Sequence, residues 1–158
     1  RRESEGLLSG KGLQPLRFRE ERSRKPSRTA DFDWLGGKIK LTDGDAVQVL
    51  PLPANTFDQT SFAYAFAFDT PDEDELSVYL TDGRRLADYK YRRVGMETLK
   101  TALGDLKALH YEKVRDAGDK RGFEIWLAVE HHRLPVRIRY IEKNGTVVDS
   151  TIIRISYR

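Results

Sequence analysis

Few side chains in this sequence have the types and the spacing that catalysis requires. Asp31 and Asp33 lie two residues apart, so both carboxylates would share one face of a strand, where such a pair can do acid–base work. The spacing supplies no third polar partner, and we interpret both as exposed strand residues. The chain has no cysteine and contains no Gly-x-Ser-x-Gly, P-loop or Gly-x-Gly-x-x-Gly motif. We therefore predict no catalytic residues and a protein that is not an enzyme.

The histidines and one acidic segment are the candidates for metal binding. His131 and His132 are adjacent, and neighbours on a strand point to opposite faces, so they cannot readily chelate one ion there. His110 is the only other histidine. Residues 69–75 hold five acidic side chains, but they lack the ligand spacing and the glycine of an EF-hand loop. We expect no metal and no cofactor, and we predict that residues 69–75 are a solvated loop.

The segment over residues 57–68 is the most aromatic part of the chain, with aromatic side chains at 62, 64, 66 and 68 separated by alanine. A strand would place all four on one side. A helix suits the alanines and would use Asp58 as its N-cap, and we favour a short helix. Phe62, Tyr64 and Phe66 would then form the wall of an apolar cavity that binds a ligand. The alternative is a helix that simply fills the core.

The clearest β pattern lies between residues 122 and 158. Apolar residues recur at every second position over 123–129 and again over 134–140, as in half-buried strands. Asn144-Gly145 follows and favours a two-residue type I′ turn, which sets the register of the hairpin. The predicted pairs are Tyr140 with Asp149, Ile138 with Thr151, Val136 with Ile153 and Leu134 with Ile155.

One face of this predicted hairpin is basic. It carries Arg137 and Arg139 together with Ser150 and Arg154, and we expect it to meet water or a polar partner. We call the face with Arg137 and Arg139 the arginine-bearing face. These two arginines and Trp126 complete our candidate ligand-binding residues.

Further hairpins are predicted along the chain. Two strands are expected over residues 3–22 and a hairpin over 30–41, and Asp82-Gly83 is expected to join strands over 76–80 and 86–94. Residues 96–114 fit either a helical stripe or two strands around a turn at 102–105. The arginine-rich run over residues 17–28 could be an arm for an anionic ligand, but we favour a solvated edge strand and loop.

Length and composition limit the possible classes. A chain of 158 residues fits one domain, and its 39% hydrophobic content with 16 aromatic residues suits a packed core. The net charge of +3 comes from well-interleaved basic and acidic residues, so we expect no nucleic-acid partner. No run of about 18 apolar residues is present, which predicts no transmembrane helix. Because the chain begins at Arg1 without a signal-peptide pattern, we expect an N-terminal strand and any signal segment to be missing from it.

The whole pattern resembles the DUF3108 family, which comprises bacterial, usually exported proteins of unassigned function. The resemblance rests on five groups of residues in the family's order: Gly12-Leu13-Gln14-Pro15, Phe32-Asp33-Trp34, residues 57–62, residues 95–104, and Ile125-Trp126-Leu127-Ala128 with residues 134–138. It implies an antiparallel curled sheet or partial β-barrel, two strands rather than a helix over 96–114, and a helix near Asp58. It supplies no catalytic residues.

The predicted fold is therefore mainly β, with about 8–10 strands and one short helix near residues 57–68, in a single β domain over residues 1–158. The leading functional hypothesis is a non-catalytic protein of the periplasm or cell envelope that holds a lipid-like apolar molecule in its curled sheet. The location follows from the family resemblance. The alternative is an interaction module that binds an envelope protein or a glycan through a sheet edge or the arginine-bearing face.

Overall fold

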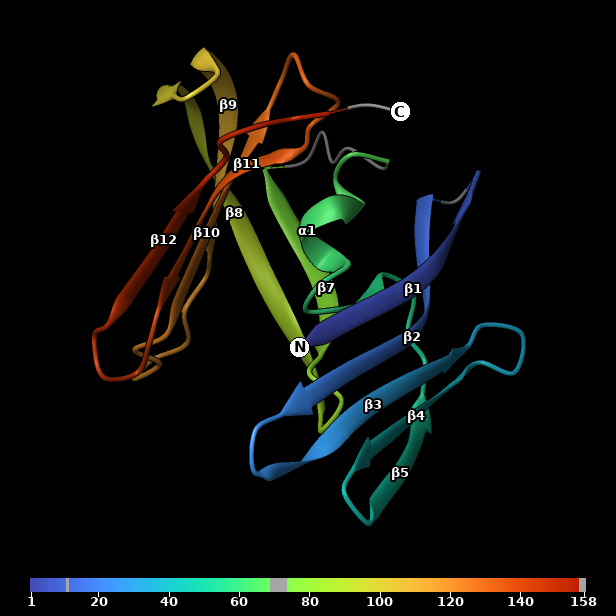
Figure 1. The fold of residues 1–158 in the computed structure, drawn as a ribbon. Helices are drawn as coiled ribbons and strands as arrows, with labels where there is room; N and C mark the ends of the chain where they lie inside the picture. The colour runs from blue at the N-terminus through green and yellow to red at the C-terminus, as the bar shows by residue number, and fades with distance from the viewer. Residues whose placement is uncertain (11, 69–73, 157–158) are drawn as a thin grey trace. The chain divides into compact units, whose positions relative to one another are not determined.

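The structure is a computed structural model that describes residues 1–10, 12–68 and 74–156 (Figure 1). The fold is mainly β, with 63% strand and 3% helix, and it contains a curled half-barrel sheet and one short helix, as predicted. The described residues form twelve strands, more than the predicted 8–10, because two strands were not anticipated: β5, which ends at Pro51, and β6, which follows Pro53. None of their helices is long and apolar enough to cross a membrane.

The chain, for which one domain was expected, divides into two compact units. Unit 1 comprises Arg1–Asp69 and Ser77–Tyr89, and unit 2 comprises Thr70–Leu76 and Lys90–Arg158. Lys11 and residues 69–73 lie outside the described residues, so most of the segment predicted to be a solvated loop is not described by the structure.

Unit 1 begins with a five-stranded antiparallel sheet in which sequence neighbours are also sheet neighbours. Its strands are β1 (Arg2–Ser9), β2 (Gly12–Arg22), β3 (Lys25–Asp33), β4 (Lys38–Asp43) and β5 (Ala46–Pro51). The predicted strands over 3–22 and the hairpin over 30–41 are confirmed. One face of the sheet is apolar because alternate residues point the same way. Its buried residues are Phe18, Ala30, Phe32, Ile39 and Leu41.

The arginine-rich run over 17–28 is not an edge, because β1 pairs with β2 on its outer side. Arg17 pairs with Asp31 at 2.9 Å, and Arg28 contacts Asp43 at 3.3 Å. Glu20 lies directly opposite Arg28 on β2. The edge-strand interpretation was therefore wrong: β2 is an internal strand, and Arg17 on β2 and Arg28 on β3 each meet a carboxylate on the next strand of the sheet.

The next three elements form a crossover. Strand β6 (Thr56–Asp58) pairs with β7 (Glu75–Thr81) in parallel, and helix α1 (Phe62–Ala65) lies in the connection. Parallel neighbours need a long connection, which residues 59–74 provide. The expectation of a purely antiparallel sheet thus fails at this pair. The predicted short helix is confirmed, although it covers only four residues.

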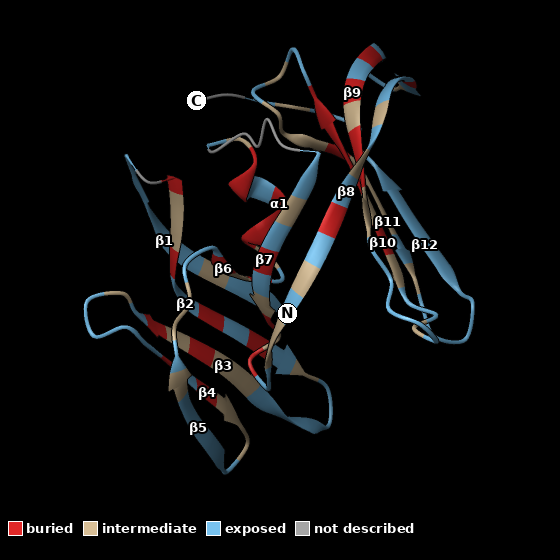
Figure 2. Ribbon diagram, turned by 180° about the vertical axis from the view of Figure 1, so that it is seen from behind, coloured by how far each residue is buried: buried red, intermediate tan, exposed pale blue. Residues whose placement is uncertain are grey.

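Unit 2 contains the end of β8 (Leu86–Thr101) followed by β9 (Gly104–Lys113), β10 (Gly122–Ala128), β11 (Pro135–Ile141) and β12 (Val147–Thr151), all antiparallel. Residues 96–114 are two strands joined by a tight turn, as the family resemblance implies, with Thr101 opposite Gly104. The second half of the central strand β10, residues 125–128, is buried on both faces and is red in Figure 2.

The predicted register of the last hairpin was wrong by one residue. Glu142 N–H donates to the Thr146 carbonyl at 2.8 Å, so the loop has three residues. Gly145 has φ +89° while Asn144 keeps a negative φ, which excludes a type I′ turn. Asn144 instead uses its side chain, whose Oδ1 accepts a hydrogen bond from Thr146 N–H at 3.0 Å. Tyr140 therefore faces Val148, and a slip of one residue moves every side chain of β12 to the other face.

Candidate functional site

The three aromatic candidates on α1 divide between the core and the surface. Phe62 is 3% exposed and Phe66 is 4% exposed, and their rings meet edge to face with centroids 5.2 Å apart. Tyr64 is exposed on the opposite side of the helix. A hollow wide enough for an acyl chain would expose the rings that line it. Phe62 and Phe66 therefore pack as core residues in this structure.

A buried carboxylate shapes the turn that leads into α1. Asp58 is fully buried, and its Oδ1 accepts hydrogen bonds from the backbone N–H groups of Thr60 at 2.8 Å and Ser61 at 2.9 Å. Its Oδ2 accepts hydrogen bonds from the hydroxyls of Ser61 at 2.8 Å and Ser4 at 2.6 Å. The N-cap residue itself is Ser61, not Asp58 as expected. Asp58 thus organises the segment before the helix.

In unit 2, Trp126 is the centre of a stack across three neighbouring strands. His110 on β9 and Arg137 on β11 both lie directly opposite Trp126 on β10. The imidazole stacks on the indole with centroids 4.1 Å apart, and the Arg137 Cζ lies 4.7 Å from the centroid of the indole. Because its partners come from opposite sides, both faces of the ring are occupied, and Trp126 is 2% exposed. A ligand would have to displace one partner to stack on it.

Two glutamates complete this cluster. The His110 Nδ1 lies 2.8 Å from Glu97 Oε1, and its Nε2 lies 3.2 Å from Glu124 Oε2. Trp126 Nε1–H donates to Glu97 Oε2 at 3.1 Å. Burial raises the pKa of Glu97, but the hydrogen bonds from Trp126 and His110 and the charge of Arg137 outweigh it, so the net pKa lies below its usual range. The described residues contain no group of acidic, His or Cys side chains that could hold a metal ion.

The corrected register explains why the arginine-bearing face is neutralised within the chain. Asp149 lies opposite Arg139, on the same face as both arginines. Its carboxylate accepts two hydrogen bonds from Arg137, at 2.9 and 2.6 Å, and one from Arg139 at 3.2 Å. The Arg137 bonds, opposed by burial and assisted by Arg139, lower the pKa of Asp149 to about 2. Glu124 also lies 3.6 Å from Arg139, so the two arginines face two carboxylates within the chain, and this face offers an external anion little unpaired charge.

The two carboxylates considered for catalysis, Asp31 and Asp33, also have partners within unit 1. Asp31 pairs with Arg17, and Asp33 Oδ1 accepts a hydrogen bond from Gly36 N–H at 2.7 Å. Both belong to unit 1, whereas His110 belongs to unit 2.

The remaining candidate is the outer edge of the unit 1 sheet. Strands β1, β5, β12 and the three-residue β6 end the sheets of the described residues. Two of these strands carry charged side chains, β1 with Arg2 and Glu3 and β12 with Asp149, and charge on an edge strand disfavours the addition of another strand. Strand β5 has the sequence Ala-Val-Gln-Val-Leu-Pro and no charge. We call residues 46–51 the β5 edge.

The backbone of the β5 edge has free hydrogen-bonding groups. Leu52 N–H donates to the Gly37 carbonyl at 3.0 Å, so Leu52 and Gly37 form a hydrogen-bonded pair. Hydrogen-bonded pairs recur at every second residue of an antiparallel ladder, and the next one joins Leu50 to Ile39. The N–H groups of Val47 and Val49 therefore point away from β4. Their side chains are 55% and 60% exposed. Pro51 is the last residue of β5 and lies at another position that faces away from β4, so its missing N–H removes no hydrogen bond between β4 and β5.

Comparison with known proteins agrees with the sequence motifs. A family profile described as "Protein of unknown function (DUF3108)" matches residues 1–151 of the 158-residue chain. The chain belongs to the DUF3108 family. No curated protein and no solved structure matches it significantly.

Two of the motifs that resemble the DUF3108 family have clear structural roles here. Residues 57–62 form the turn that Asp58 holds, and residues 125–128 form the doubly buried half of β10. The sequence analysis named Trp126, Arg137 and Arg139 as candidates but not the residues that contact them, because only a correct strand register places those residues beside them. It also missed the β5 edge, whose signal was the uncharged run after Asp45. The missed cluster residues are Glu97, His110, Glu124 and Asp149.

Proposed function

We propose that this DUF3108 chain is a non-catalytic interaction module of the bacterial cell envelope that binds an extended segment of a partner protein along the β5 edge. The observation that carries the proposal is the absence of charge from β5, in contrast to the charged end strands β1 and β12. A free edge accepts an added strand through its backbone groups, and exposed side chains on alternate positions supply selectivity. The envelope location is supported by the family resemblance.

The two other surfaces considered support binding less well. The aromatic residues Phe62 and Phe66 are packed, so an apolar ligand would have to separate them. The arginine-bearing face already meets Asp149 and Trp126 within unit 2. The β5 edge combines free backbone donors with exposed valines, and no internal rearrangement is needed to use them.

A peptide display experiment tests the proposal. Random peptides are selected on the immobilised full chain, and amide hydrogen exchange is then measured with and without a selected peptide. We expect slower exchange at the N–H groups of Val47 and Val49. The variant Val49→Lys should lose binding while its thermal stability is unchanged, and Leu8→Lys, a matched change on the β1 edge, should bind as the wild type does. Equal binding by Val49→Lys, or the absence of any selected binder, would overturn the proposal.

A further inference from the structure

The side chains around the β5 edge are mostly basic, and this inference rests on the proposed function. We infer that the partner segment is acidic, with its carboxylates toward the Pro51 end of β5. On the outer face of the sheet, Lys40 lies directly opposite Val49, and Lys38 lies opposite Pro51. Both lysines are exposed, and neither has an ion pair within the described part of the chain.

The carboxylates nearest to these lysines along the sheet are engaged elsewhere. Asp31 and Asp33 lie opposite Lys40 and Lys38 on β3. Asp31 pairs with Arg17 at 2.9 Å, and Asp33 accepts the Gly36 N–H. Neither carboxylate forms an ion pair with these lysines, so both ammonium groups are available to an outside partner.

The other face of β5 is basic as well. Gln48 Nε2–H donates to the Arg84 carbonyl at 3.4 Å, which places the loop with Arg84 and Arg85 beside the strand. Both arginine side chains are exposed. Arg84 approaches Asp43 only at 3.9 Å, and Asp43 is already shared with other arginines. An added strand would thus meet positive charge on both of its faces.

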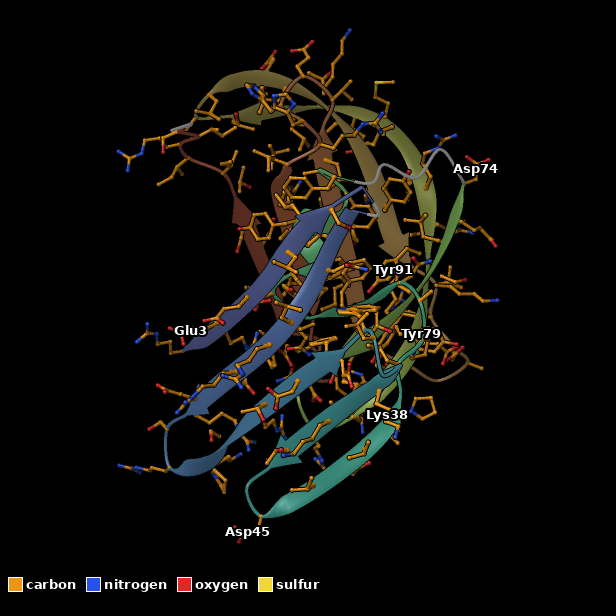
Figure 3. The ribbon with its side chains drawn as sticks, turned by 90° about the vertical axis from the view of Figure 1, so that its right-hand side faces the viewer. Glu3, Lys38, Asp45, Asp74, Tyr79 and Tyr91 are labelled. Carbon is orange, nitrogen blue, oxygen red and sulfur yellow. The ribbon has the colours of Figure 1, made fainter. Side chains whose placement is uncertain are left out.

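The position of Asp45 gives the partner a preferred orientation. It is exposed in the tight turn that precedes β5, and Figure 3 shows Lys38 and Asp45 at opposite ends of the β4–β5 hairpin. A strand added to β5 lies two strand spacings from β4, about 10 Å, which a lysine and a carboxylate side chain can bridge across Val49. Acidic residues are therefore favoured near Lys38 and Lys40 and disfavoured near Asp45.

Fluorescence anisotropy with three synthetic peptides tests the charge preference. Each peptide has about ten residues and keeps valine or threonine at alternate positions, while its other positions carry Glu, Gln or Lys. We expect the Glu peptide to bind the full chain roughly tenfold more tightly than the Gln peptide at low salt, with a smaller advantage at high salt. The double variant Lys38→Glu/Lys40→Glu should reverse this order. The control Lys107→Glu/Lys120→Glu makes the same change in net charge on unit 2 and should preserve the order.

Hydrogen exchange at Val47 and Val49 separates the two ideas. If the Gln peptide binds as tightly as the Glu peptide and slows exchange there, the charge inference is wrong and the edge-binding function stands. If the Lys38→Glu/Lys40→Glu variant behaves like its control, the inference is also wrong. If no peptide slows exchange at these two amides, the proposed function fails, and the inference fails with it.

Discussion

Removing the buried carboxylate of Asp58 should destabilise unit 1 by an amount that depends on what replaces it. Asp58→Ala leaves the N–H groups of Thr60 and Ser61 without their acceptor in a buried turn. Each such loss costs about 1–3 kcal/mol, so we expect a decrease of about 4 kcal/mol in the free energy of unfolding. The two serine hydroxyls can rotate, and we assign them no cost.

Asp58→Asn should cost less, because the amide oxygen can still accept both backbone N–H groups. What it loses is the charge on the acceptor, which makes hydrogen bonds roughly twice as strong, and we expect a decrease of about 1–2 kcal/mol. Asp31→Ala is the control. It removes an exposed pair with Arg17 and should cost less than about 1 kcal/mol.

Urea unfolding followed by circular dichroism measures these differences. Each unit contains one tryptophan, Trp34 in unit 1 and Trp126 in unit 2. In a Trp126→Phe background, the fluorescence of Trp34 therefore reports the unfolding of the unit that contains Asp58. Equal losses for Asp58→Asn and Asp58→Ala, or a loss for Asp58→Ala no larger than that for Asp31→Ala, would refute the reasoning.

Three further predictions concern unit 2. The pKa of Asp149 is lowered from 3.8 to about 2, so the contribution of its carboxylate to stability is complete above pH 3.8 and is lost as the pH falls toward 2. In acid titrations, Asp149→Asn should therefore lose less stability than the wild type over this range. Identical pH profiles would contradict this prediction. Arg133 has φ +55° in the β10–β11 turn, so Arg133→Gly should increase the free energy of unfolding by about 0.5–1 kcal/mol and raise the midpoint of thermal unfolding, while Arg133→Val should lower that midpoint. The reverse order would show that side-chain contacts outweigh backbone strain. Trp126→Ala should cost about 3–5 kcal/mol in urea unfolding, because it removes a buried ring stacked between His110 and Arg137. A loss below about 1 kcal/mol would contradict the structural role of Trp126.

Local sequence patterns were sufficient for several elements. The alternation in β2, β3 and β4 predicted half-buried strands, and the aromatic segment with its alanines predicted α1. These succeed because side-chain period and local propensity depend only on neighbours in sequence. The turn at residues 143–145 shows the limit of local patterns. Asn-Gly is compatible with loops of two or three residues, and the choice between them inverted the faces of β12.

The candidate sites depended on pairing across strands. Nothing near His110 in the sequence indicated that its neighbours would be Trp126 and two glutamates from β8 and β10. The same holds for Asp149, which was predicted to face Tyr140 and instead accepts hydrogen bonds from Arg137 and Arg139. Once the register is known, these contacts follow from geometry, but they are absent from any single segment of the chain.

The sequence by itself determined a mainly β protein of the DUF3108 family with one short helix, because composition, alternation and motif order are properties of the linear chain. Only the tertiary structure decided which candidate side chains already have partners within the chain and which strand edge has none among the described residues. Phe62 and Phe66 are packed, Trp126 is covered on both faces, and Val47 and Val49 remain exposed on β5, which has a neighbouring strand on one side only. The physical reason is that burial and hydrogen-bond satisfaction depend on contacts between distant residues, and those contacts exist only after the strands have paired.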